Sequence, residues 1–162
     1  MARIAKNIKS RDVANYFVYR ANQDNVIITN KKIQKLVYYA QAWSLVLLNK
    51  KLFNEKIEAW VHGPAVLELY SKYKKFGFSS IKESIDAGDV KFSKKITDLL
   101  DNVWNVYGKM DARYLEFLTH SEKPWQEARN GLHGFESSHN EISCKSMKAF
   151  YSELLASTKS NA

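Results

Sequence analysis

Residues 29–48 read T-N-K-K-I-Q-K-L-V-Y-Y-A-Q-A-W-S-L-V-L-L, and this stretch decides the fold. Its apolar residues recur at the 3.6-residue period of an amphipathic helix, on a stripe with Ile33, Leu36, Val37, Ala40, Trp43, Ser44 and Leu47. After Leu36 the remaining faces are also apolar or aromatic. A helix without a polar side is buried all round, so we predict a central helix here.

Both ends of this helix fit a core position. Thr29 is a good N-cap, and Ile28 before it is placed to pack on Ile33, four positions into the helix. From Leu36 to Leu48 no residue is charged, but about 13 residues fall short of the roughly 20 that a bilayer span needs. We therefore expect a core helix and no membrane partner.

The composition indicates one mainly α domain. A chain of 162 residues with 45% hydrophobic and 13% aromatic residues is long and apolar enough to bury one core. Only two prolines and six glycines argue against a many-turned all-β fold. We predict a single globular domain over residues 1–162, with its core in 12–155 and about six helices around the buried helix 29–48.

The remaining elements are predicted from the spacing of apolar residues and from capping residues, glycine and proline. Besides the central helix, we predict helices over 12–22, 64–76, 93–107, 111–118, 124–130 and 143–155. A short strand is expected at 57–61, which could pair with 90–92 in one two-stranded β element. Gly63 should cap the helix that Pro64 begins, and Thr119 and Glu122 have the spacing of a capping box. Residues 156–162 should form a flexible tail.

The charge balance leaves several partner classes open. Lysine and arginine total 25 against 17 acidic residues, which gives a net charge of +8. Such a surface attracts nucleic acid, anionic lipid or an acidic protein, or it stays solvated. Lys31, Lys32 and Lys35 crowd the helix start, where the macrodipole prefers acids. Two further clusters are Lys72, Lys74 and Lys75, and Lys91, Lys94 and Lys95.

Two features favour a cytoplasmic protein. The single cysteine, Cys144, allows no internal disulfide and suits a reducing compartment. The N-terminal residues M-A-R-I-A-K-N-I-K-S contain no apolar run long enough for a secretory signal.

The candidate chemical groups are weak. His133 and His139, with Glu136 between them, lack the fixed spacing of a zinc site, so we expect no metal. Cys144 at a helix start could be an activated thiol, but no partner base is evident, and a packed thiol is favoured. No phosphate loop, nucleophile elbow or dinucleotide fingerprint occurs, so we expect no cofactor.

One polar set could support acid–base chemistry. His120 and Glu122, with Trp125 and Arg129 one and two turns along, could form a small site. We favour a structural interpretation, in which Glu122 closes the capping box on Thr119 and Trp125 packs. The sequence therefore predicts a protein that is not an enzyme.

Four segments together resemble a known family. They are I-T-N-K-K-I-Q-K-L-V-Y-Y-A-Q-A-W, L-F-N-E-K-I-E-A-W-V-H-G-P-A-V, L-T-H-S-E-K-P-W-Q-E-A-R and I-S-C-K-S-M-K-A-F-Y. In this order they resemble the Panacea antitoxin domain, first known from phage-associated proteins. The resemblance implies a largely helical antitoxin of a toxin–antitoxin gene pair, in bacteria, phages and other mobile elements, which neutralises a toxin protein encoded by the adjacent gene.

The positions that match the family pattern are Thr29, Gln34, Lys35, Leu36, Tyr38, Tyr39, Trp43, Trp60, Gly63, Pro64, Thr119, His120, Trp125 and Arg129. Lys31 and Lys32 depart from it, because an apolar residue usually accompanies one lysine there. Ala65 departs as well, since valine commonly follows Gly-Pro.

We expect an antitoxin that binds its cognate toxin directly, and two alternatives stay open. One is an adaptor that delivers a partner to a cellular protease, with the 156–162 tail as a handle. The other is a regulatory protein that binds nucleic acid through its lysine clusters. The predicted partner-binding residues are Lys31, Lys32, Lys35, Tyr39, His62, His120 and Arg129. Thr29, Gln34, Trp43, Trp60, Gly63, Pro64 and Trp125 are predicted to have structural roles.

Overall fold

The computed structural model describes residues 7–160 of the chain. These residues form seven α-helices and one two-stranded antiparallel sheet. In chain order the elements are α1 Ser10–Asp24, α2 Asn30–Leu47, β1 Glu58–Trp60, β2 Gly63–Ala65, α3 Leu67–Tyr73, α4 Lys94–Tyr107, α5 Ala112–His120, α6 Lys123–Arg129 and α7 Cys144–Ser160. The predicted mainly α class, with one short β element, is confirmed.

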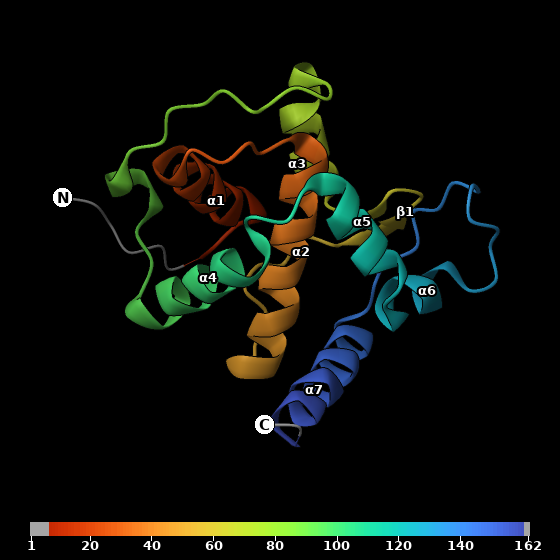
Figure 1. Cartoon of the computed structure of the whole chain (residues 1–162). Helices are drawn as coiled ribbons and strands as arrows, with labels where there is room; N and C mark the ends of the chain where they lie inside the picture. The colour runs from red at the N-terminus through yellow and green to blue at the C-terminus, as the bar shows by residue number, and fades with distance from the viewer. Residues whose placement is uncertain (1–6, 161–162) are drawn as a thin grey trace.

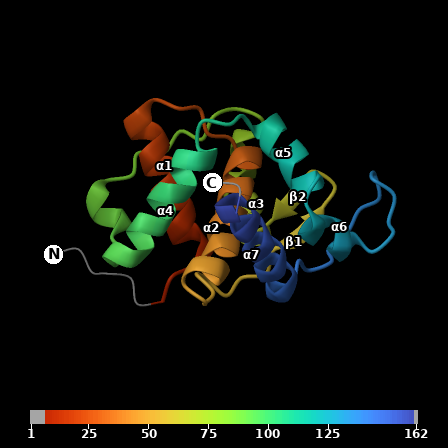
Figure 2. The ribbon, with the colours of Figure 1, turned by 60° about the horizontal axis from the view of Figure 1, so that its bottom comes forward.

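The central position of α2 is confirmed. It contacts α1, α3, α4, α5, α7 and β2, and runs through the middle of the molecule in Figures 1 and 2. Thr29 caps it, since its side-chain oxygen accepts a hydrogen bond from the backbone N–H of Lys32 at 3.2 Å. These neighbours bury most of α2, including the polar side chains of Gln34, Lys35 and Gln41.

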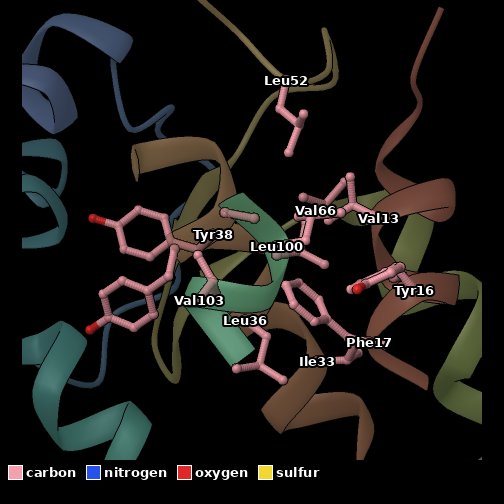
Figure 3. Close-up of a cluster of buried hydrophobic side chains, with 14 of the residues drawn as sticks. Val13, Tyr16, Phe17, Ile33, Leu36, Tyr38, Leu52, Val66, Leu100 and Val103 are labelled. Carbon is pink, nitrogen blue, oxygen red and sulfur yellow. The ribbon is translucent and has the colours of Figure 1, made fainter. Parts of the chain in front are cut away.

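The core extends along α2 from Ile33 to Leu45. Ile33 and Leu36 meet Val13 and Phe17 of α1 and Leu100 of α4 (Figure 3), and all five side chains are fully buried. Burial of a side chain of this size contributes about 1.5–3 kcal/mol to folding. Among the described residues, none of the helices combines the length and hydropathy of a bilayer span.

The β element differs from the prediction. Gly63–Ala65 pairs with Glu58–Trp60 as strand β2, with Trp60 opposite Gly63, so Gly63 and Pro64 do not begin a helix. Gly63 has φ +111°, a value that excludes it from a helix. Pro64 is tolerated because an edge strand leaves its missing N–H without consequence. The following helix, α3, therefore starts at Leu67.

Two other segments also differ. Residues 90–92 do not pair with β1; instead Ala87–Val90 forms a 3₁₀ turn capped by Asp86 and Asp89, and Val90 and Phe92 are buried. Helix α7 continues to Ser160, so the expected flexible tail is helical up to that residue, and residues 161–162 lie outside the described part. Residues 1–6, which bear on the predicted lack of a signal, lie outside it too.

Candidate functional site

A pocket opens between the start of α2 and the β-hairpin formed by β1 and β2. Its volume is about 460 Å³, and we call it the hairpin pocket. Its walls include Lys31, Gln34 and Lys35 of α2, Trp60, His62 and Gly63 of the hairpin, and Tyr70, Lys74 and Phe78 of α3 and the segment after it. A larger hollow of about 580 Å³ beside Ser80–Ser84 contains none of the positions that match the family pattern. The hairpin pocket contains four of them, Gln34, Lys35, Trp60 and Gly63, and is the candidate site.

Gln34 holds the wall of the pocket in place. Its Oε1 accepts a hydrogen bond from the backbone N–H of Val66 at 2.8 Å, and its Nε2 donates to Oδ1 of Asn30 at 3.2 Å. The first bond ties the end of β2 to α2. Its predicted structural role therefore has a physical basis, because a buried N–H without a partner would cost about 1–3 kcal/mol.

Lys35 lies at the base of the pocket and only 2% of it is exposed. Within the described residues its ammonium group has no hydrogen-bond acceptor and no ion-pair partner. Burial lowers the pKa of Lys35 to about 7; Glu116 opposes this shift and Lys31 adds to it. The predicted partner-binding residue is therefore a recessed group and not a surface cation.

Gly63 leaves the space that the Lys35 side chain occupies. A Cβ on Gly63 would lie 2.6 Å from Cε of Lys35 and 3.0 Å from Oγ1 of Thr119. The first distance is shorter than real Cβ contacts, so the Lys35 side chain would have to move, and the second is tighter than nearly all of them. This close approach explains the glycine in the family pattern at a position where the backbone also needs a positive φ.

Lys31 and His62 share one carboxylate at the edge of the pocket. Lys31 forms an ion pair with Glu116 of α5, and Nδ1 of His62 lies 2.7 Å from Oε1 of the same residue. Burial of Glu116 opposes its ionisation, but Lys31 and His62 outweigh this effect and lower its pKa. The two predicted partner-binding residues thus already have an intramolecular partner, although the His62 side chain is 75% exposed.

His120 lies against Trp125, with the ring centroids 4.0 Å apart, and its Nε2 is buried without a hydrogen-bond partner among the described residues. Burial lowers its pKa, and the nearby charge of Lys35 acts in the same direction. Trp125 itself donates a hydrogen bond to the carbonyl oxygen of Trp60 at 2.7 Å. His120 therefore packs beside the hairpin, and the predicted structural role of Trp125 includes fixing β1.

The predicted capping box at Thr119 and Glu122 is wrong. The Thr119 hydroxyl donates to carbonyl oxygens in its own helix, while Oε1 of Glu122 accepts hydrogen bonds from the Tyr39 and Tyr151 hydroxyls at 2.7 and 2.8 Å. A buried hydroxyl without an acceptor costs free energy, whereas the N–H groups of a solvated helix end can bond to water, so the carboxylate pairs with the tyrosines. Burial raises the pKa of Glu122, and the two hydroxyls oppose the rise. Glu122 is thus engaged in the core, and among the described residues no hydrogen bond joins it to His120.

Three more predicted partner-binding residues are occupied or enclosed. Tyr39 is fully buried and stacks on Tyr107 at 3.9 Å between centroids. Arg129 is 3% exposed and donates hydrogen bonds to the carbonyl oxygens of Ala59, His133 and Glu136. Lys32 is 4% exposed and does not line the pocket. These positions differ from the exposed residues that we predicted, because packing between elements far apart in the chain encloses them.

The remaining candidates lie apart from the pocket. Trp43 donates a hydrogen bond to the Tyr107 hydroxyl at 3.0 Å and so connects α2 to α4. Cys144 is half-buried at the start of α7. Nδ1 of His139 lies 3.1 Å from Oε1 of Glu58, and the described residues contain no group of three or more His, Cys, Asp or Glu side chains with metal-site geometry.

Sequence reasoning missed four residues of the site. Glu116 was not predicted, nor were the pocket residues Tyr70, Lys74 and Phe78 as a group. Phe78 is 99% exposed and Tyr70 is 44% exposed, so the pocket has an aromatic rim. A signal for Phe78 did exist: it follows Gly77 and precedes two serines, where no apolar stripe requires a phenylalanine.

The sequence is similar to that of known antitoxins. The family model described as "Antitoxin SocA-like, Panacea domain" matches residues 33–126, more than half of the chain. The chain is 28% identical over 137 residues to Antitoxin SocA of Caulobacter vibrioides (strain NA1000 / CB15N), an alignment that covers 78% of this chain and 73% of the relative. No solved structure matches the chain significantly. Because the family model covers α2, the hairpin and α5, this chain belongs to the SocA-like Panacea antitoxin family.

Proposed function

We propose that this protein neutralises a toxin protein, encoded by the adjacent gene, by binding it directly through the rim of the hairpin pocket. Membership of an antitoxin family supports the general role. The observation that supports this surface is Phe78, a 99% exposed phenylalanine at the edge of a pocket built from family-pattern residues. Exposed aromatic side chains beside a concave site are typical of the energetic centre of a protein interface.

The rim offers the mixture that protein interfaces use. Trp60 and Tyr70 contact each other edge to face, with centroids 5.1 Å apart, and Leu67 on the same helix as Tyr70 is 52% exposed. Lys74 adds a cation at the pocket. Interface centres are enriched in aromatic residues and surrounded by a polar rim, so a toxin surface of complementary shape would cover apolar area here.

We further propose that neutralisation is occlusion without chemistry, in the cytoplasm. Glu122, one half of the candidate acid–base pair, is engaged by two tyrosine hydroxyls, which supports a structural role for it. The single cysteine suits a reducing compartment. The protease-adaptor alternative has less support, because α7 is helical through the proposed handle up to Ser160. The nucleic-acid alternative loses one of its three lysine clusters, because Lys32 and Lys35 are enclosed where phosphates would need them exposed.

Co-expression tests the proposal. The adjacent gene should inhibit growth when expressed alone, and this protein should restore growth and co-purify with its product. Phe78→Ser should abolish both effects and leave the free energy of unfolding within about 0.5 kcal/mol of wild type, since the side chain is solvated. Phe135→Ser is the matched control, because Phe135 is 94% exposed on the segment between α6 and α7 and does not line the pocket. A toxin neutralised equally by both variants would exclude this surface.

A further inference from the structure

The base of the hairpin pocket contains a buried cation that lacks an anion. Lys35 is 2% exposed, and the described residues supply its ammonium group with neither a carboxylate within ion-pair distance nor a hydrogen-bond acceptor. Glu116 acts on it electrostatically but is already bound by Lys31 and His62. Buried charges in proteins are normally paired, and an unpaired buried amine shifts toward its neutral form, so an anion bound here would supply the missing partner and favour the charged amine.

The chain maintains this arrangement through the residue opposite Lys35. Gly63 has no side chain, and a Cβ there would lie 2.6 Å from Cε and 3.3 Å from Nζ of Lys35. The hairpin therefore approaches the lysine closely while the pocket beyond stays open, with a volume of about 460 Å³. This volume lies within the range of pockets that hold small ligands or single side chains.

The pocket walls indicate the class of ligand. Trp60, Tyr70 and Phe78 supply aromatic surface, and the cation lies beneath them. A phosphate group is usually held by several converging donors, such as an arginine fork or a row of backbone N–H groups. In the hairpin pocket Lys31 is already paired with Glu116 and Lys74 is exposed, so Lys35 is the enclosed ammonium, and the described residues that line the pocket include no arginine. An enclosed ammonium beside aromatic walls matches a carboxylate that carries an apolar group.

We propose that the hairpin pocket is a binding site for a carboxylate attached to an apolar group, and that Lys35 pairs with the carboxylate. On the toxin, the occupant is an aspartate or glutamate side chain beside an apolar residue. The second statement rests on the proposed function, whereas the first is a property of this protein alone.

Carboxylate binding should depend on pH. Burial holds the pKa of Lys35 at about 7 in the empty pocket, and a bound carboxylate favours the charged form, so the complex takes up a proton near neutral pH. Affinity should therefore fall by up to roughly tenfold for each pH unit above 7, until the pKa of the occupied pocket is reached. The other titratable and charged groups around Lys35 are Lys31, His62, Lys74, Glu116 and His120.

The test uses the whole protein and defined probes. Phenylacetate is titrated while the ε-methylene signal of Lys35 is followed by NMR in isotopically labelled protein, and phenylacetamide serves as the neutral control. Phenylacetate should shift the signal saturably and raise the pKa of Lys35, and phenylacetamide should not. Equal binding of the amide, tighter binding of phenyl phosphate, or no saturable shift would each overturn the carboxylate site.

Two variants, Lys35→Met and Phe78→Ser, test the carboxylate site and its occupation by the toxin separately. Lys35→Met should weaken phenylacetate binding about tenfold or more, and Lys145→Met, which changes an exposed lysine of α7, should not. In co-expression, Lys35→Met should neutralise the toxin poorly. If Lys35→Met loses phenylacetate but still neutralises, the acidic occupant on the toxin is excluded. If phenylacetate binds as expected while Phe78→Ser neutralises fully, the proposed docking surface fails and the carboxylate site stands.

Discussion

A Cβ added at Gly63 would lie 2.6 Å from Cε of Lys35, so the Lys35 side chain fills the space that a side chain at position 63 would need. The pair joins two segments of the family pattern that are 28 positions apart, as 63 − 35 shows. Because Gly63 has no side chain, the Lys35 side chain can lie at the base of the hairpin pocket. The relationship is steric, and mutation can therefore measure it.

Gly63→Ala should lower the free energy of unfolding by about 1–3 kcal/mol, through the positive φ and the contact with Lys35. Gly131→Ala is the matched control, because Gly131 has φ +82° and its added Cβ meets nothing within 4 Å. The loss of unfolding free energy in Gly63→Ala beyond that in Gly131→Ala, measured by urea denaturation, reports the contribution of the close contacts at position 63. Adding Lys35→Ala should remove the part of this excess that comes from Lys35 and leave the part that comes from the 3.0 Å contact with Thr119. A Gly63→Ala penalty that is unchanged in the Lys35→Ala background would contradict the steric account of the Gly63–Lys35 pair.

Lys35→Met should stabilise the protein at pH 7 by about 2–4 kcal/mol, because it removes a buried group whose pKa is lowered from 10.5 to about 7. Between these values the unfolded chain binds a proton that the folded protein does not. Wild-type stability therefore rises with pH across this window, and the advantage of the variant should shrink toward pH 10. Lys145→Met is the control for general charge effects, and a difference between Lys35→Met and wild type that does not change with pH would refute the buried-amine account.

Local patterns predicted the helices whose boundaries depend on neighbours in the chain. Asp111 caps α5 as expected, since its Oδ1 accepts a hydrogen bond from the backbone N–H of Tyr114 at 2.7 Å. The apolar stripe of α4 likewise ends at Tyr107, directly before the expected Gly108. In both cases the groups that decide the structure are within a few residues of each other, so periodicity and capping rules are sufficient.

The misplaced features depend on residues that are distant in sequence. Gly63-Pro64 fits a helix start and an edge strand equally well, and pairing with Trp60 decides between them. The spacing of Thr119 and Glu122 satisfies the capping-box pattern, but hydroxyls from α2 and α7 take the carboxylate. For Lys35, a charge near a helix start indicates exposure unless the hairpin is known to cover it.

Glu122→Gln should retain stability within about 1 kcal/mol at pH 7, because the amide oxygen can still accept from the Tyr39 and Tyr151 hydroxyls. Glu122→Ala should cost about 2–4 kcal/mol, since it removes the acceptor that both buried hydroxyls share and leaves a cavity. Thermal and urea unfolding of the two variants provide the comparison. Equal losses in Glu122→Gln and Glu122→Ala would show that the charge, and not the acceptor, matters.

The same carboxyl group should affect the pH dependence of stability. The pKa of Glu122 is raised above 4.5 by burial, so the folded protein binds more protons than the unfolded chain in the window just above this value. The stabilisation from the protonated form is complete below pH 4.5 and is lost as the pH rises through the folded pKa. The stability of wild type relative to Glu122→Gln should therefore fall as the pH rises through that window; a constant difference would contradict the raised pKa.

Arg129→Lys should destabilise the protein by about 2 kcal/mol or more, although it preserves the charge. The guanidinium donates to the carbonyl oxygens of Ala59, His133 and Glu136 at 3.1, 2.9 and 2.5 Å, and an ammonium group cannot reproduce this planar set. Faster hydrogen exchange should appear first in residues 130–141, because Arg129 connects that segment to β1. Arg113→Lys, at an exposed position of α5, should change neither property. If Arg129→Lys leaves exchange in 130–141 unchanged, then the segment is held by its other contacts, such as the hydrogen bond from Asn140 to Ala128, and the proposed role of Arg129 in fixing it is refuted.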